Sequence, residues 1–104
     1  MIAEHFKEDG SYEIEYMNGK YKIRPDMVNS LLGYALRHEP VGHFLQAVLS
    51  NNLFDAMTRA DKDNFENLPA FVNFIYWEIP DRCWGSMQAY KDWIAEGRHG
   101  EFDT

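Results

Sequence analysis

The feature that most constrains the fold is a series of short apolar stripes between Val41 and Trp84, separated by Asn, Asp and Pro residues. Within each stripe, apolar residues recur every three or four positions, as on one face of an α-helix. The first stripe consists of Val41, Phe44, Leu45, Val48 and Leu49. A helical period that is interrupted so often predicts several short helices around a shared core.

The segment 41–60 can form one helix or two. Its later apolar residues keep the phase of the first stripe, so one continuous helix is an open alternative. We prefer a break at Ser50-Asn51-Asn52, because these side chains compete for backbone hydrogen bonds and favour helix caps. The preferred interpretation is a short helix before the break and a further helix that starts near Asn52.

Proline residues bound two further predicted helices. Pro25 suits the first turn of a helix, and Glu39-Pro40 breaks the helical pattern after it. Another stripe occupies roughly Pro69 to Glu78 and ends at Pro80, after an irregular or helical lead-in from Lys62. Its apolar face is expected to consist of Phe71, Val72, Ile75, Tyr76 and Ile79.

The last predicted helix is bounded by its caps. Ser86 is a favourable N-cap for a helix over Met87 to Ala95. Gly97 is expected to end this helix, because glycine is the preferred residue just after a helix C-terminus. Residues 98–104 are then expected to be loosely ordered.

A β-hairpin is predicted at residues 11–24. Asn18-Gly19 is the strongest short-range turn signal, because both central positions of a type I′ turn need positive φ. The resulting register pairs Met17 with Lys20, Tyr16 with Tyr21, Glu15 with Lys22, Ile14 with Ile23 and Glu13 with Arg24. One face is then apolar or aromatic, and the other pairs acids with bases. An isolated hairpin is marginally stable, so the apolar face must pack on helices or on another chain.

The expected fold is mainly α: a compact bundle of four to five short helices with an N-terminal β-hairpin over about residues 12–24. A chain of 104 residues that is 45% hydrophobic predicts a single domain, 1–104. Within it, 11–24 form the hairpin and 25–97 the helical core. Residues 1–10 are expected to be loosely ordered apart from Ile2 and Phe6, which can dock on the core.

The net charge of -7 makes direct nucleic-acid binding unfavourable. It favours solubility, or binding to a basic surface of a partner protein. In the second case the acidic surface can imitate nucleic acid. No signal peptide is recognisable, and no apolar stretch approaches the roughly 20 residues that span a bilayer. We therefore expect a soluble protein of the cytoplasm, without membrane contact.

No metal, cofactor or enzymatic activity is expected. The histidines at positions 5, 38, 43 and 99 do not have metal-ligand spacing. Asp61, Asp63 and Asn64 resemble part of a calcium loop, but its glycine and final Glu are missing, so helix capping by Asp61 is preferred. Cys83 can be a nucleophile near a helix start or a small buried hydrophobe. The second interpretation is preferred, because no motif supplies a His and an orienting acid.

The aromatic content of 15% exceeds the needs of a small core, so one or two rings are expected to be exposed as interface residues. Tyr12 and Tyr16 are the first candidates, because a hairpin has two faces and two edges to satisfy. The full set of partner-binding candidates is Tyr12, Tyr16, Asn51, Asn52, Asp55 and Trp84.

An ordered set of short motifs runs through residues 21–95. It comprises Pro25-Asp26-Met27, the Phe44–Leu49 run, Asn51-Asn52-Leu53, Ala60-Asp61, Tyr76 before Pro80, and Cys83-Trp84-Gly85-Ser86. In this order the chain resembles a group of small proteins encoded by bacteriophages and prophages. An Asp is usual in that group where this chain has Asn52, a change that a capping role tolerates and an acid or metal role does not. The resemblance implies a phage or mobile-element origin and a compact, mostly helical fold, and it implies no catalytic residues.

Three functional hypotheses follow. The first is a small phage-type accessory protein that binds and inhibits, or modulates, a host protein such as a defence component in the host cytoplasm. The alternative is a small-molecule binder, for example of a nucleotide signal, in which aromatic rings and Asn51 contact a base; the acidic charge opposes this. The third is an enzyme that uses Cys83. A homodimer is compatible with each, because a hairpin edge and a small core both favour self-association.

Overall fold

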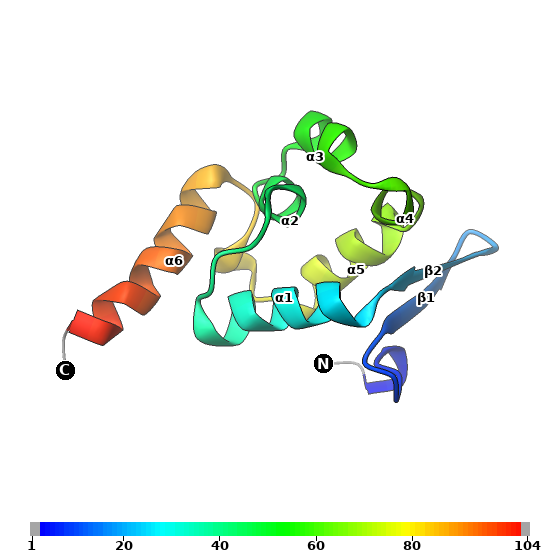
Figure 1. Cartoon of the computed structure of the whole chain (residues 1–104), viewed down its shortest axis with the longest axis horizontal. Coiled ribbons are helices and arrows are strands. Elements are labelled where there is room, and N and C mark those ends of the chain that lie inside the picture. Colours follow the sequence, from blue (N-terminus) through cyan, green and yellow to red (C-terminus); the bar gives the residue numbers. More distant parts are fainter. Residues whose placement is uncertain (1–2, 103–104) are drawn as a thin grey trace.

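The computed structural model describes residues 3–102, which form a mainly α fold with an N-terminal hairpin (Figure 1). The strands are β1 (Tyr12–Tyr16) and β2 (Gly19–Ile23). The α-helices in this part of the chain are α1 (Pro25–Arg37), α2 (His43–Leu49), α3 (Leu53–Arg59), α4 (Lys62–Glu66), α5 (Leu68–Glu78) and α6 (Met87–Phe102). Two short 3-10 helices, η1 (Ala3–His5) and η2 (Asp81–Cys83), complete the fold.

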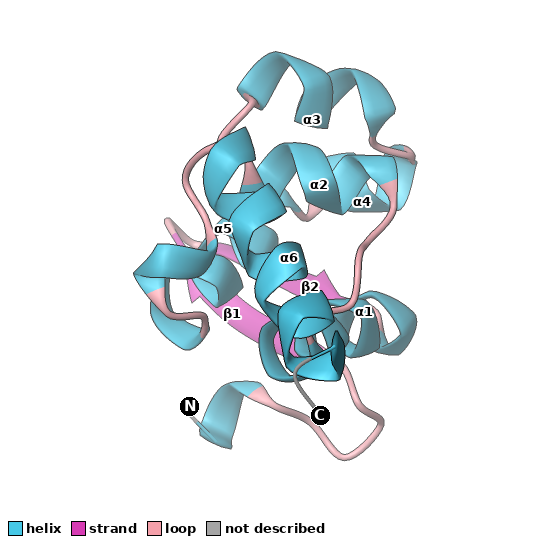
Figure 2. Ribbon diagram, turned by 90° about the vertical axis from the view of Figure 1, so that its left-hand side faces the viewer, coloured by secondary structure: helices cyan, strands magenta, loops and turns pink. Residues whose placement is uncertain are grey.

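The molecule is compact but flat. Its Cα radius of gyration is 13.8 Å, close to the roughly 13 Å expected for about 100 residues in a compact domain. Its extents are 48 × 31 × 20 Å. The hairpin and α6 lie at opposite ends of the long axis, and α3 lies on the side opposite η1 (Figures 1 and 2). No helix in the described part of the chain is long and apolar enough to cross a membrane.

The expected break within 41–60 is confirmed. Asn51 has φ +59°, the left-handed conformation that closes many helices. Its N–H donates to the Val48 carbonyl at 3.1 Å, and the Asn52 N–H donates to the Ala47 carbonyl at 2.9 Å. The Asn52 side chain then accepts from the Asp55 N–H at 3.1 Å and caps α3. Two neighbouring asparagines therefore end one helix and begin the next.

Of the two alternatives for the lead-in from Lys62, the structure shows the helical one. Asp61 accepts from the Asn64 N–H at 2.7 Å and caps α4, as expected. The described chain therefore has six α-helices rather than four or five.

Gly97 does not end α6, which continues to Phe102. Gly97 instead permits close packing, because a Cβ at that position would collide with Cβ of His38. The expectation that residues 98–104 are loosely ordered stays a prediction; the helix includes residues 98–102, and residues 103–104 lie outside the described range.

The prediction of the hairpin is correct in its position and in which side chains share a face, but the observed register differs from the predicted one by two residues. The turn is formed by Met17 and Asn18, both with positive φ (+48° and +67°). The observed pairs are Tyr12 with Ile23, Glu13 with Lys22, Ile14 with Tyr21, Glu15 with Lys20, and Tyr16 with Gly19. A shift of two keeps every side chain on its face and still pairs acids with bases. It differs in giving Tyr12 a partner in Ile23, and both side chains are fully buried.

The hairpin is held by α5 and by the N-terminal segment. The Tyr12 ring lies 4.8 Å from Phe74 and 5.1 Å from Phe6, between ring centroids and in edge-on geometry. Phe6 therefore docks as expected, whereas Ile2 lies outside the described residues. At the other end of the core, the Tyr34 ring stacks on Tyr90 at 5.4 Å. The helices thus supply the support that a two-stranded hairpin lacks alone.

Candidate functional site: an aromatic groove between the hairpin and α5

The candidate site is a groove of about 400 Å³ between β1 and α5. We call it the aromatic groove. It is lined by Ile14, Tyr16, Leu68, Pro69, Val72, Asn73, Tyr76 and Trp77. Tyr16, Tyr76 and Trp77 are 57%, 59% and 63% exposed. Interface hot spots are enriched in Tyr and Trp, so this surface has the composition of a binding site.

The helix α5 builds the groove because it is apolar on more than one face. Phe71, Phe74 and Ile75 face the core and are at most 4% exposed. Val72, Tyr76 and Trp77 project outward and are each more than half exposed. A helix that is apolar all round is normally buried on all sides. The outer face of α5 therefore has the character of a surface that a partner covers.

Within the described part of the chain, the polar atoms of the three exposed rings have no hydrogen-bond partner. The hydroxyls of Tyr16 and Tyr76 and the indole N–H of Trp77 make no hydrogen bond to any described residue. The other two indole groups are used inside the fold. Trp84 Nε1 donates to the Ile79 carbonyl at 3.1 Å, and Trp93 Nε1 donates to the Tyr34 carbonyl at 2.6 Å. The groove thus presents three free hydrogen-bonding groups on an apolar surface.

A smaller hollow continues the groove. The hollow has a volume of about 100 Å³. Val72 and Tyr76 line both the groove and the hollow, and Asn51 and Trp84 line the hollow beside them. The Tyr76 and Trp84 ring centroids are 5.9 Å apart. Three predicted binding residues, Tyr16, Asn51 and Trp84, therefore share one continuous surface.

The other predicted residues lie elsewhere. Asn52 and Asp55 line a separate hollow of about 80 Å³ beside His43 and Arg59, and their side chains are engaged in capping α3. The expectation that Tyr12 is exposed is wrong. Its side chain is fully buried, because the apolar face of the hairpin packs it against Phe74 of α5 and against Phe6. Its hydroxyl accepts from Asn73 Nδ2 at 2.8 Å, and burial raises the pKa of this phenol above its usual value.

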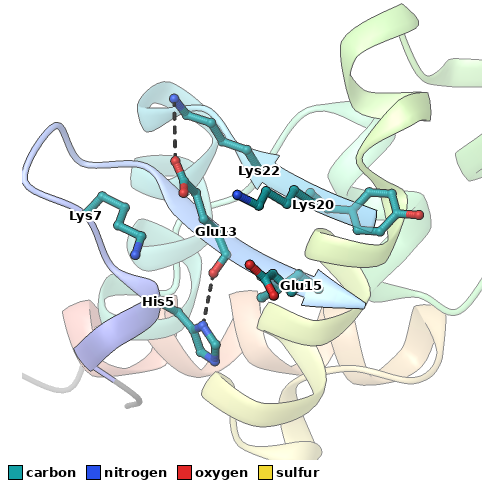
Figure 3. Close-up of a pocket in the computed structure, with 8 residues that line it drawn as sticks. His5, Lys7, Glu13, Glu15, Lys20 and Lys22 are labelled. Atoms are coloured by element: carbon teal, nitrogen blue, oxygen red, sulfur yellow. Dashed lines mark hydrogen bonds and ion pairs between the residues drawn. The ribbon is translucent and has the colours of Figure 1, made fainter. Parts of the chain in front are cut away.

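The opposite face of the hairpin carries a larger concavity of mixed charge, about 690 Å³ in volume (Figure 3). Lys7, Lys20 and Lys22 lie there beside Glu13 and Glu15. Lys22 Nζ is 3.9 Å from Glu13 and 3.6 Å from Asp9, between exposed side chains. Carboxylates thus offset the positive charge that an anionic ligand would need. Despite its larger volume, this face is the weaker binding candidate.

Cys83 has the environment of a core residue. Its side chain is fully buried, and burial raises the pKa of its thiol, which is the opposite of nucleophile activation. Its carbonyl accepts from the Tyr34 hydroxyl at 2.6 Å. Among the described residues, no group of three or more His, Cys, Asp or Glu side chains is placed to hold a metal ion.

The sequence interpretation missed the outward direction of Val72 and Tyr76 and did not select Trp77. The first two belong to the stripe that was expected to face the core, yet they are 57% and 59% exposed. The sequence contains a signal for this surface. Six of the seven residues from Phe71 to Trp77 are apolar or aromatic, which is more than one face of a helix can hold, so some of them must point away from the core.

The chain was also compared with known proteins. No protein-family model, curated protein or solved structure matches it.

Proposed function

We propose that this chain is a non-catalytic binding protein that recognises another protein through the aromatic groove. The observation that carries the proposal is the set of three rings, Tyr16, Tyr76 and Trp77, each more than half exposed. They stand on two elements fixed to each other by the buried contact between Tyr12 and Phe74. A rigid aromatic surface loses little side-chain entropy on binding, which favours affinity.

We further propose that the partner is a host protein and that the chain is a phage-type accessory protein. The resemblance to small phage and prophage proteins supports this origin, and the net charge of -7 supports a partner with a basic surface. Inhibition or modulation of a defence component in the host cytoplasm is the activity that best fits a small binder.

The test is capture from bacterial extract by tagged protein, with a matched pair of variants. Trp77→Ser removes a groove ring that is 63% exposed, and Phe54→Ser removes a ring on α3 that is 83% exposed. Both side chains are mainly solvated, so neither change should unfold the protein. We expect wild type and Phe54→Ser to capture the same host protein and Trp77→Ser to lose it. Equal capture by both variants, or no reproducible partner for wild type, contradicts the proposal.

Binding of a nucleotide signal is the alternative, and the lysines on the charged face of the hairpin are its support. The carboxylates of Glu13 and Glu15 beside them weaken it, because phosphates prefer cationic sites. A thermal-shift panel of nucleotides decides between the two functions. We expect no stabilisation. A shift that Lys20→Ala abolishes would favour the alternative.

A further inference from the structure

The free polar atoms of the aromatic groove restrict what can occupy it. The Tyr16 and Tyr76 hydroxyls and Trp77 Nε1 can all donate hydrogen bonds, and no described residue accepts them. Leaving a donor unpaired on burial costs about 1–3 kcal/mol, so the occupant must present acceptors along an apolar surface. The backbone of an α-helix does not, because its carbonyls are bonded internally, so a helix offers side-chain acceptors alone. A polyproline II segment does, because it has no internal hydrogen bonds and its carbonyls stay free.

The edges of the hairpin argue against a partner that adds a strand. At β1, Phe6 pairs with Tyr12, and His5 Nδ1 lies 3.0 Å from the Glu13 carbonyl oxygen. At β2, the Lys22 N–H donates to Asn67 Oδ1 at 2.7 Å. Both edges are thus engaged by this chain's own residues, and strand addition would have to displace them.

The lining also matches an extended apolar ligand. Tyr16, Tyr76 and Trp77 line the groove together with Pro69, and aromatic-lined grooves of this kind recognise proline-rich segments in polyproline II conformation. Such a segment is already stiff before binding, so it loses little conformational entropy.

The negative net charge of this chain favours basic residues on either side of the bound segment. None of the groove residues, all within the described range, is charged, and the only charged residue in α5 is Glu78. In a chain of net charge -7, the surrounding potential favours cations. The exposed Trp77 ring offers a face on which a guanidinium can stack.

From this we propose that the aromatic groove binds a proline-rich segment in polyproline II conformation, flanked by arginine or lysine residues. This inference rests on the proposed function, because it names the partner segment of the same site. The ligand's proline rings pack between the aromatic side chains, and its carbonyls accept from the Tyr16 and Tyr76 hydroxyls and from Trp77 Nε1.

The three tryptophans supply the measurement. In a ¹H–¹⁵N NMR spectrum of the full chain, the indole signal of Trp77 reports on the groove, whereas Trp93, which is 7% exposed and bonded to Tyr34, is an internal control. The probe is an arginine-flanked oligoproline peptide. We expect it to move the Trp77 signal in a saturable manner and to leave Trp93 unchanged. Tyr16→Ser should weaken binding at least about tenfold, as for an interface hot spot, and Phe54→Ser should not.

Three control ligands can overturn the inference. One is an arginine-flanked glycine-serine peptide of equal length, one a glutamate-flanked oligoproline, and one a basic amphipathic helical peptide. If the first peptide binds equally well, charge alone causes binding and proline is not recognised. If the second binds equally well, the basic flanking residues are not required. If the third binds equally well, the groove accepts a helix and the polyproline II conformation is not required. A Trp77 shift caused by raising the protein concentration alone would identify a second copy as the occupant.

A silent Trp77 signal at millimolar peptide also overturns the inference, and it does so independently of the proposed function. If Trp77→Ser still abolishes capture of a host protein, the groove binds a partner of another class. If the same variant leaves capture unchanged, the proposed function fails as well.

Discussion

Replacing Tyr12 tests whether the contact between the hairpin and α5 holds the groove together. Tyr12→Phe removes only the hydroxyl, which accepts from Asn73 Nδ2 at 2.8 Å. Asn73 is partly exposed and can turn to water, so we expect a loss of about 1 kcal/mol in the free energy of unfolding. Tyr12→Ala also removes a fully buried ring that contacts Phe74 and Phe6, which should cost about 3–5 kcal/mol.

The assay is thermal unfolding of wild type and the two variants, followed by circular dichroism. For a domain of this size, about 1 kcal/mol corresponds to a fall of roughly 4–8 °C in Tm, which is the expectation for Tyr12→Phe. Tyr12→Ala should lower Tm by several times that amount. The reasoning is refuted if the two variants lose the same stability, because the ring would then contribute nothing. A Tyr12→Ala variant as stable as wild type would show that the hairpin is not anchored there.

Three further predictions concern local structure. Asn51 has φ +59°, so Asn51→Val should destabilise by about 1–2 kcal/mol and Asn51→Gly should not, as measured by urea unfolding. Gly97→Ala should destabilise by about 1–3 kcal/mol despite the better helix propensity of alanine, because the new Cβ would collide with His38; an increase in Tm would contradict this contact. Asp61 has a lowered pKa, mainly through the hydrogen bond from the Asn64 N–H, so its stabilising effect is present above the usual carboxyl pKa and is lost as pH falls through the lower folded value. Asp61→Asn should therefore be less stable than wild type at neutral pH, and the gap should close in acid; a gap independent of pH would exclude the charge as its cause.

The helix boundaries could be predicted because each depends on residues close in sequence. Asn52, Asp61 and Ser86 all accept a backbone N–H three residues ahead, at 3.1, 2.7 and 3.0 Å. A cap of this kind is encoded by one side chain and its neighbours, so a sequence pattern finds it. The end of α6 was wrong for the complementary reason. Gly97 is required by a distant residue, His38, and no local pattern reports that contact.

The hairpin register was also beyond the reach of local patterns. The predicted and observed registers differ by two residues, so both give the same faces and both pair acids with lysine or arginine. Turn chemistry favours Asn18-Gly19, and the left-handed conformation of Met17 costs about 1–2 kcal/mol. Burial of a large side chain such as Tyr12 stabilises the folded state by about 1.5–3 kcal/mol. The observed register pairs the buried Tyr12 with the buried Ile23, a contact that the turn sequence does not encode.

The same register shift makes one wall of the candidate site. In the predicted register Tyr16 lies opposite Tyr21, and two rings would cover each other. In the observed register Tyr16 lies opposite Gly19, which has no side chain, and the Tyr21 hydroxyl occupies the nearby space, 2.9 Å from where a Cβ on Gly19 would be. The residue paired with Tyr16 thus contributes no side chain, and the Tyr16 ring is 57% exposed at the groove. The register that pairs the buried Tyr12 with Ile23 is also the one that places Tyr16 opposite a glycine, so this core contact and the proposed binding surface depend on the same register.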